Sequence, residues 1–213
     1  LMNDNLDQMR TAWTGGALAG GDKLYPASPS LADRIWQATF SVEGARRAGL
    51  AGDGLMLSRT QPRPKDKPNL SLAEIQNPMI DAYLEALPKG RTPRIIACRT
   101  VFVVDDPKDA LRLAEIGLSR LRHRLADTRH RDGTELVGDL ITALDIHIGT
   151  AEEVTASLLA DDTLKRATDM TVQSHSIDPP HPFIMRSIEL VAEKIGPALG
   201  WQADAASAVR RVA

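Results

Sequence analysis

Residues 34–59, RIWQATFSVEGARRAGLAGDGLMLSR, hold the pattern that most constrains how this chain can fold. Residues 35–40 are apolar and β-branched, which is typical of a buried parallel strand. Ser41 follows at once and is a favoured N-cap residue, so a small alanine-rich helix is expected over residues 45–50. Residues 54–57, Gly-Leu-Met-Leu, predict a second buried strand. The segment therefore predicts strand, turn, helix and strand in close succession.

The turn at Ser41 has the composition of an anion-binding site. A helix N-terminus presents free amide N–H groups, and this one would lie at the carboxyl end of a parallel strand. Ser41 adds a hydroxyl, and Gly44 lets a bulky group approach the backbone. On this pattern alone the structural interpretation is favoured, with Ser41 as a plain helix cap and Arg59 as a solvated side chain.

The rest of the chain continues as alternating helices and strands. Ser71 and Glu74 form a capping box, and Asp106-Pro107 is a standard helix entry. The predicted elements are a helix over 72–87 that Pro78 can interrupt, a strand over 94–104, a helix over 107–125 with Leu111, Ala114, Leu118, Leu121 and Leu125 on its apolar side, a helix starting at 149–154, a strand over 168–174, and a final helix burying Ile184, Ile188, Val191 and Ile195.

The alternation predicts an α/β fold with a parallel sheet of about four strands. A doubly wound open sheet and half of a (β/α)8 TIM barrel would give the same alternation. In either fold, functional residues are expected at the carboxyl ends of the strands.

Five blocks carry a resemblance to a known family: WQATFSVEGARRAG, GDGLMLSRTQPRP, EIQNPMIDAYL, HIGTAEEV and HSIDPPH. Together they resemble the flavin-dependent luciferase-like monooxygenases, most closely a bacterial FMN-dependent subgroup, over residues 6–201. The resemblance implies a (β/α)8 TIM barrel of the bacterial-luciferase type. Residues 1–201 would be the C-terminal portion of that barrel domain, with about four of its strands, and residues 202–213 a tail.

The resemblance also implies roles for particular residues. The phosphate of FMN would be held at the turn after the first strand and at the residues that follow the second. His175, after the last strand, is the candidate catalytic residue, as a substrate contact or proton donor, with Asp178 and His181 nearby. Metal binding by these three residues is the weaker alternative. The implied cofactor-binding residues are Thr39, Ser41, Val42, Glu43, Gly44, Ser58 and Arg59.

By the same resemblance, the chain would belong to a monooxygenase that uses reduced FMN and O2, as paired donors, to oxidise a small organic substrate. A separate flavin reductase would supply the reduced FMN. One alternative is an oxidoreductase of the same superfamily that uses the deazaflavin F420. Another is a non-catalytic flavoprotein or pairing subunit. Half a barrel leaves open sheet edges, so a homodimer or pairing with an N-terminal half is expected.

Composition narrows the partners further. The 213 residues have a net charge of −2, and this balance favours neither nucleic acid nor an anionic membrane as a partner. Cys98 is the only cysteine, which excludes an intrachain disulfide and fits a reducing cytoplasm. We expect it to be a buried, inert thiol. No metal-ligand spacing of Cys and His is present, and no apolar run approaches the ~18 residues of a membrane span.

Overall fold

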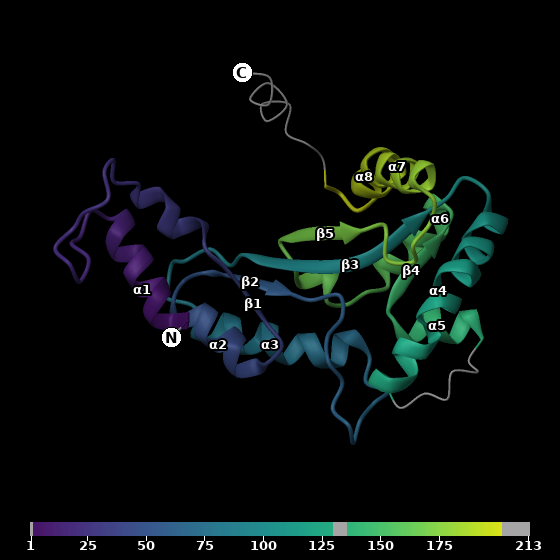
Figure 1. Ribbon diagram of the computed structural model, residues 1–213, viewed down its shortest axis with the longest axis horizontal. Coiled ribbons are helices and arrows are strands. Elements are labelled where there is room, and N and C mark those ends of the chain that lie inside the picture. The colour runs from purple at the N-terminus through teal and green to yellow at the C-terminus, as the bar shows by residue number, and fades with distance from the viewer. Residues whose placement is uncertain (1, 130–135, 202–213) are drawn as a thin grey trace.

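The computed structural model describes residues 2–129 and 136–201 (Figure 1). Helices and parallel strands alternate along these residues, as the sequence predicts. The elements are α1 Met2–Trp13, η1 Pro29–Arg34, β1 Trp36–Thr39, α2 Val42–Leu50, β2 Gly54–Leu57, α3 Leu72–Ala86, β3 Ile95–Val103, α4 Pro107–Arg129, α5 Val137–Ala143, β4 Ile146–Gly149, α6 Ala151–Leu159, η2 Leu164–Arg166, β5 Asp169–Gln173, α7 His181–Leu190, η3 Val191–Ile195, which is a single π turn, and α8 Gly196–Ala198.

All five strands are parallel, and β3 is the centre of the sheet (Figure 1). Its first residues pair with β2, which in turn pairs with β1. Thr100 of β3 is paired both with Ile146 of β4 and with Gln173 of β5, so β4 and β5 lie on opposite sides of β3. Because β5 also lies opposite β2, β4 continues the β2 side of the sheet beyond the end of β2.

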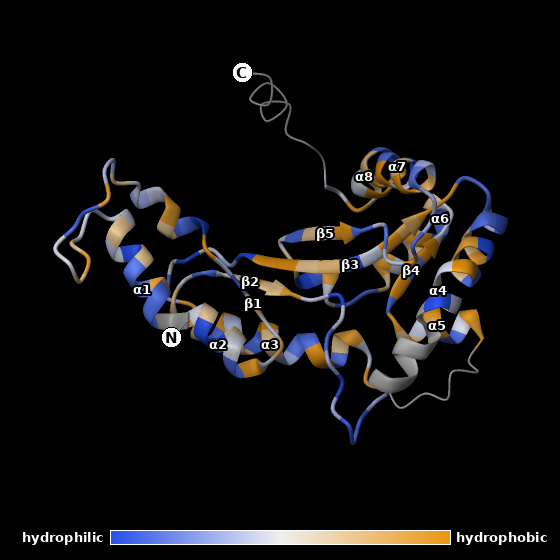
Figure 2. Ribbon diagram, in the orientation of Figure 1, coloured by the Kyte–Doolittle hydropathy of each residue, from blue (hydrophilic) through white to orange (hydrophobic). Residues whose placement is uncertain are grey.

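Alternate residues of the strands face the helices and form the core. Figure 2 shows hydrophobic colours along much of β2, β3 and β5. Leu55, Leu57 and Ile95 pack against α2 and α3. Further along β3, Val101 and Val103 pack against α6 and the segment that follows α7. These apolar contacts hold α2, α3, α6 and the segment after α7 on one face of the sheet.

The second face of the sheet is covered only at its far end. Phe102 and Val104 pack there against α4, α5 and the buried Ile177. Toward β1 the same face has exposed or half-buried side chains, among them Ala38, Met56 and Thr171. Cys98 lies on this open part and is half-buried, so the expectation of a fully buried thiol is wrong.

The structure adds a fifth strand to the expected four. Residues 146–149, which lie at and before the predicted helix start, form β4 and pair with Thr100 to Val103. The five strands do not close on themselves, because β1, β4 and β5 each pair with a single neighbour in the described part of the chain. The α/β fold with a parallel sheet is therefore confirmed, while the half-barrel stays a prediction.

Three expectations about helices need correction. Pro78 does not break α3, which runs unbroken from Leu72 to Ala86. Leu111 is exposed, because α4 turns Ala110, Leu113 and Ala114 toward the core instead. Ile188 of α7 is also exposed, and its neighbours Ser187 and Leu190 are buried. The side chains of Leu121 and Leu125, and the tail from residue 202, lie outside the described residues.

Candidate functional site

The turn between β1 and α2 forms the first part of the candidate site. Ser41 is the N-cap of α2, and its side-chain oxygen accepts a hydrogen bond from the Gly44 amide at 3.1 Å. Thr39, the last residue of β1, accepts a hydrogen bond from the Ser41 amide at 3.2 Å. These two hydroxyls fix the path of the chain from the strand into the helix.

Two backbone amides at the start of α2 are left with hydrogen-bonding capacity. The N–H groups of Val42 and Glu43 make no hydrogen bond within the described residues. Both residues are exposed, and they lie at the positive end of the helix dipole. Together with the Ser41 hydroxyl, which can still donate its proton, they form a set of donors suited to an anion.

Gly44 is required by the local packing. A Cβ atom at this position would collide with the side chain of Thr39 and would press on the Ser41 hydroxyl. Glycine therefore lets α2 begin directly against the end of β1. This places Gly44 in the framework of the turn, whereas the sequence analysis suggested that it admits a ligand.

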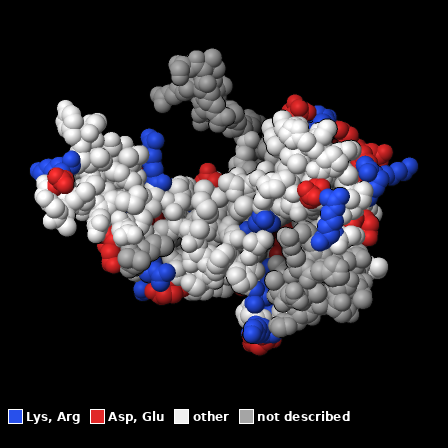
Figure 3. Space-filling view, in the orientation of Figure 1, with Lys and Arg blue, Asp and Glu red and all other residues white. Residues whose placement is uncertain are grey.

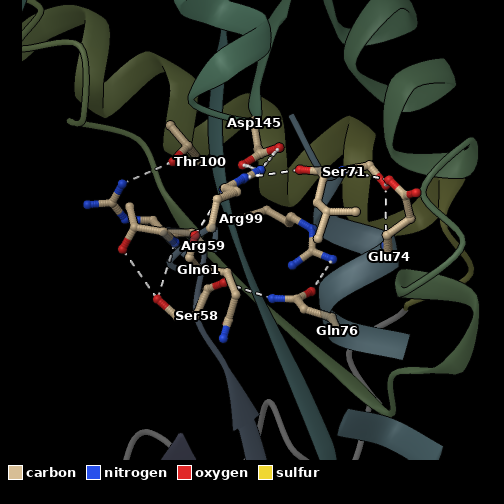
Figure 4. A network of polar contacts seen from close by, with 12 residues as sticks. Ser58, Arg59, Gln61, Ser71, Glu74, Gln76, Arg99, Thr100 and Asp145 are labelled. Atoms are coloured by element: carbon tan, nitrogen blue, oxygen red, sulfur yellow. Dashed lines mark hydrogen bonds and ion pairs between the residues drawn. The ribbon is translucent and has the colours of Figure 1, made fainter. Parts of the chain in front are cut away.

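Ser58 and Arg59 follow the carboxyl end of β2, the neighbour of β1 (Figure 4). Thr39 pairs with Leu57, so these two residues leave the sheet beside the turn at Ser41. The half-buried Arg59 guanidinium donates to the Thr100 hydroxyl at 3.2 Å. The Ser58 hydroxyl lies 3.3 Å from that of Thr60. An arginine in this position offers further N–H donors in the fork geometry that suits phosphate.

His175 lies at the carboxyl end of β5 and contacts Gln173, which the sequence analysis did not single out. The Nε2 atoms of Gln173 and His175 are 2.8 Å apart. Because an amide nitrogen only donates, this contact assigns the acceptor role to Nε2 of His175 and the proton to its Nδ1. Gln173 is paired with Thr100 across the sheet, so Arg59, Thr100, Gln173 and His175 lie in one row over three strands.

Asp178 and His181 do not join His175 in a catalytic pair. The Asp178 carboxylate forms an ion pair with Arg120 of α4 at 2.6 Å. Only its backbone amide reaches His175, where it donates to the carbonyl oxygen at 2.9 Å. Over the described ranges, no group of three His, Cys, Asp or Glu side chains is placed to hold a metal ion.

A buried arginine, Arg99, lies below the site, and the sequence predicted no individual role for it. The Arg99 side chain is 0% exposed, and its Nε atom lies 2.6 Å from the Asp161 carboxylate. The sequence signal is a second charged residue, after Arg94, within the largely apolar run of residues 94–104. Burial by itself raises the pKa of Asp161, but the hydrogen bond and charge of Arg99 outweigh it and bring that pKa below its ordinary value.

The face of the molecule seen in Figure 3 carries no single sign of charge. In Figure 3, Lys and Arg side chains are interspersed with Asp and Glu side chains. None of the described helices is both long enough and apolar enough to span a bilayer.

Solved structures share this fold, although the sequence matches no family model and no curated protein. One is the FMN complex of the oxygenating constituent of 3,6-diketocamphane monooxygenase from Pseudomonas putida, with a TM-score of 0.64 and 17% identity, covering 92% of this chain and 62% of that chain. A second is the monooxygenase RslO1 from Streptomyces bottropensis, with a TM-score of 0.59 and 22% identity, covering 92% of this chain and 60% of that chain.

A third is the coenzyme F420 dependent tetrahydromethanopterin reductase from Methanopyrus kandleri, with a TM-score of 0.56 and 15% identity, covering 93% of this chain and 62% of that chain. At these identities the similarity shows the fold. The chain spans about three fifths of the length of each of these structures. The fold is therefore the α/β class, with a parallel sheet, that these two monooxygenases and the F420 dependent reductase share.

Proposed function

We propose that this chain holds the phosphate end of FMN at the carboxyl ends of β1 and β2, as part of a flavin-dependent monooxygenase. The observation that carries the proposal is the donor set at one edge of the sheet: the free amides of Val42 and Glu43, the Ser41 hydroxyl and the Arg59 guanidinium. These groups fit a phosphate in number and in chemistry. Similarity of fold to a monooxygenase in complex with FMN supports the assignment.

Each residue has a defined task in this proposal. Thr39 and Gly44 shape the turn, Ser41 and Arg59 donate to the phosphate oxygens, and Ser58 contributes a hydroxyl nearby. Glu43 lies in the first turn of α2, where a carboxylate favours the helix but repels a phosphate. The reduced flavin, supplied by a separate reductase, would provide the chemistry with O2 that oxidises a small organic substrate.

His175 is assigned to the substrate side of the site. Its Nε2 is occupied by Gln173, so the Nδ1–H group is the one available to donate to a substrate oxygen. This role, the soluble cytoplasmic setting and a homodimer, or pairing with further barrel strands, are parts of the same proposal.

Flavin titrations test the proposal directly. We expect the chain to quench the fluorescence of FMN on binding and to bind FMN more tightly than riboflavin, which lacks the phosphate. Arg59→Met should weaken FMN binding by about tenfold, since it removes one charge-assisted contact. Ser41→Gly leaves a residue that is tolerated as a helix cap but removes the hydroxyl, so it should also weaken FMN binding. Glu43→Gln should bind FMN at least as tightly as the wild-type chain does. Equal affinities of the wild-type chain for FMN and riboflavin would contradict the phosphate site.

The deazaflavin F420 is the second candidate cofactor. A likeness of fold to an F420-dependent reductase favours it, and F420 also presents a phosphate group to the donors described above. Parallel titrations with FMN and F420 separate the two. Oxygen uptake with reduced FMN then distinguishes a monooxygenase from an enzyme that transfers hydride. Flavin binding without turnover, in a complex with all its partner chains, would favour the non-catalytic pairing subunit.

A further inference from the structure

A chain of polar side chains connects the turn after β2 to the segment after α6, and Figure 4 shows its links from Ser58 to Gln76 and from Gln76 to Arg99. Arg99 is at its centre and is fully buried. Its three nitrogens donate to Asp161 at 2.6 Å, to the Cys98 carbonyl oxygen at 2.8 Å and to the Gln76 side-chain oxygen at 3.1 Å. A buried guanidinium needs such partners, because an unpaired charge in the interior is strongly destabilising.

Gln76 connects Arg99 to the backbone of Ser58 through its side-chain amide. Its side chain is 0% exposed, and its Nε2 atom donates to the Ser58 carbonyl oxygen at 2.8 Å. An arginine can only donate hydrogen bonds. Arg99 therefore forces the Gln76 amide to turn its oxygen inward, and the amide nitrogen must then face Ser58. Without Arg99 the amide could rotate and leave the Ser58 carbonyl oxygen without its donor.

Asp161 anchors the other end of the chain. One of its carboxylate oxygens binds Arg99, and the other accepts hydrogen bonds from the amides of Thr163 and Leu164 at 2.9 Å and 3.3 Å. The carboxylate is thereby tied to the backbone as well as to the arginine. This leaves Arg99 little freedom to move away from Gln76.

We propose that Asp161, Arg99 and Gln76 act as a positioning relay, which holds the Ser58 carbonyl oxygen so that Ser58 and Arg59 face the flavin phosphate. The inference rests on the proposed function. The three residues touch neither cofactor nor substrate and act through the backbone of Ser58. The relay accounts for the fixed position of Ser58 and Arg59 at the edge of the sheet.

Gln76→Met tests the relay, with Gln61→Met as the matched control. Gln61 is also 0% exposed and follows the same strand, but its side-chain amide reaches only the Met79 sulfur at 3.6 Å. Two quantities are measured in both variants: the ratio of the dissociation constants for riboflavin and FMN, and amide hydrogen exchange of the segment 58–60 without flavin. A general loss of stability would weaken the binding of both flavins by the same factor. It would therefore not change the ratio of their dissociation constants.

We expect Gln76→Met to lower the ratio about fivefold and to speed exchange in segment 58–60, while Gln61→Met changes neither. Unchanged exchange in Gln76→Met would overturn the relay. Faster exchange with an unchanged ratio would overturn its role toward the phosphate. If the wild-type chain does not prefer FMN to riboflavin, the proposed function fails and with it the link to phosphate, whereas the exchange data still decide whether the relay holds the turn.

Discussion

At the scale of single residues, Gly117 controls how closely α4 approaches the loop after β5. This glycine is buried in the helix, and a Cβ atom there would overlap the Ile177 carbonyl oxygen. Ile177 is itself 0% exposed and belongs to the core cluster of α4. The helix and the loop that carries His175 are therefore packed backbone against backbone.

Gly117→Ala should lower the free energy of unfolding by about 2 kcal/mol, because the added methyl group forces the loop away from α4. The effect runs against helix propensity, which favours alanine. Urea denaturation measures it. Gly138→Ala is the control, since Gly138 is helical and a Cβ there meets nothing within 4 Å. Equal effects of the two substitutions would show that the close approach is unimportant.

His147 of β4 is a half-buried histidine whose pKa sets a pH dependence. Burial is the largest cause that lowers its pKa, Asp161 opposes it and Arg99 adds to it, and together they bring the pKa from 6.5 to about 4. Its Nδ1 atom lies 2.8 Å from the Ser157 hydroxyl. The folded chain therefore keeps His147 neutral at pH values where the unfolded chain would already bind a proton.

Stability should fall between pH 7 and pH 5, because the proton bound by His147 in the unfolded state favours unfolding. The contribution is fully present above pH 6.5 and is lost as the pH falls toward about 4. At pH 5 the loss should be about 2 kcal/mol. Urea denaturation at both pH values measures it. His147→Gln should remove most of this difference, while the exposed His181→Gln should leave it unchanged.

The residues of the site differ in how far the sequence could predict them. Ser41 directly follows residues 35–40 and Ser58-Arg59 follow the apolar run 54–57, so their place at strand ends follows from local pattern. The helix cap of Ser41 is confirmed. Gln173 and Gln76 carry no such signal, because their partners Thr100, His175 and Ser58 depend on sheet register and on helix packing. Register is a property of strands brought together in three dimensions.

At the scale of elements, the loop between β2 and α3 is fastened by Arg63. The side chain is 9% exposed and binds both carboxylate oxygens of Asp145 at 2.8 and 2.6 Å. It also donates to the carbonyl oxygens of Gln61 and Leu70, at the two ends of the loop. One side chain thus closes the loop and ties it to the turn before β4.

Arg63→Gln should open this loop to proteases. Lys65 and Lys67 are exposed within it, so a lysine-specific protease should cleave there at least about tenfold faster in the variant. The reason is that the substitution removes the ion pair and both loop-closing hydrogen bonds. Arg91→Gln, which breaks the exposed pair with Asp33, is the control and should not change cleavage in this loop. Cleavage at the wild-type rate would show that Arg63 does not restrain the loop.

Most elements could be predicted, and the exceptions have physical causes. Strand β2 and most of β3 lie in apolar runs, whereas β1 and β5 alternate apolar residues with Gln, Thr or Asp. The strand β4 was missed because its four residues include His147 and lie next to a strong helix start at Thr150. The helix α3 tolerates Pro78 because its capping box and five buried side chains hold it on either side.

At the scale of the whole molecule, we expect the uncovered part of the sheet and its free edges to bind a partner chain. Phe40, beside β1, is 62% exposed, and Ala38 and Thr171 are also exposed. Sheet edges with unpaired backbone groups favour association. A second copy of the chain, or a chain that supplies further strands, would cover both.

We expect the purified chain to self-associate at micromolar concentrations in sedimentation velocity experiments. Phe40→Ser should shift it toward the monomer, because the substitution removes apolar area at the free edge. The control is Tyr25→Ser, since Tyr25 is 95% exposed in the loop before η1. A wild-type chain that remains monomeric over this range would contradict the prediction.

The three-partner strand β3 also sets the order in which a newly made chain can fold. Once residue 103 has left the ribosome, β1, β2 and β3 can assemble with α2 and α3, because the strand pairs and helix contacts among these five elements are then present. The other edge of β3 waits for β5, whose neighbour Thr168 lies 73 residues beyond Ile95. A ribosome that stalls in this interval would leave that edge open to neighbouring nascent chains, so this is the stage at which chaperones would matter most.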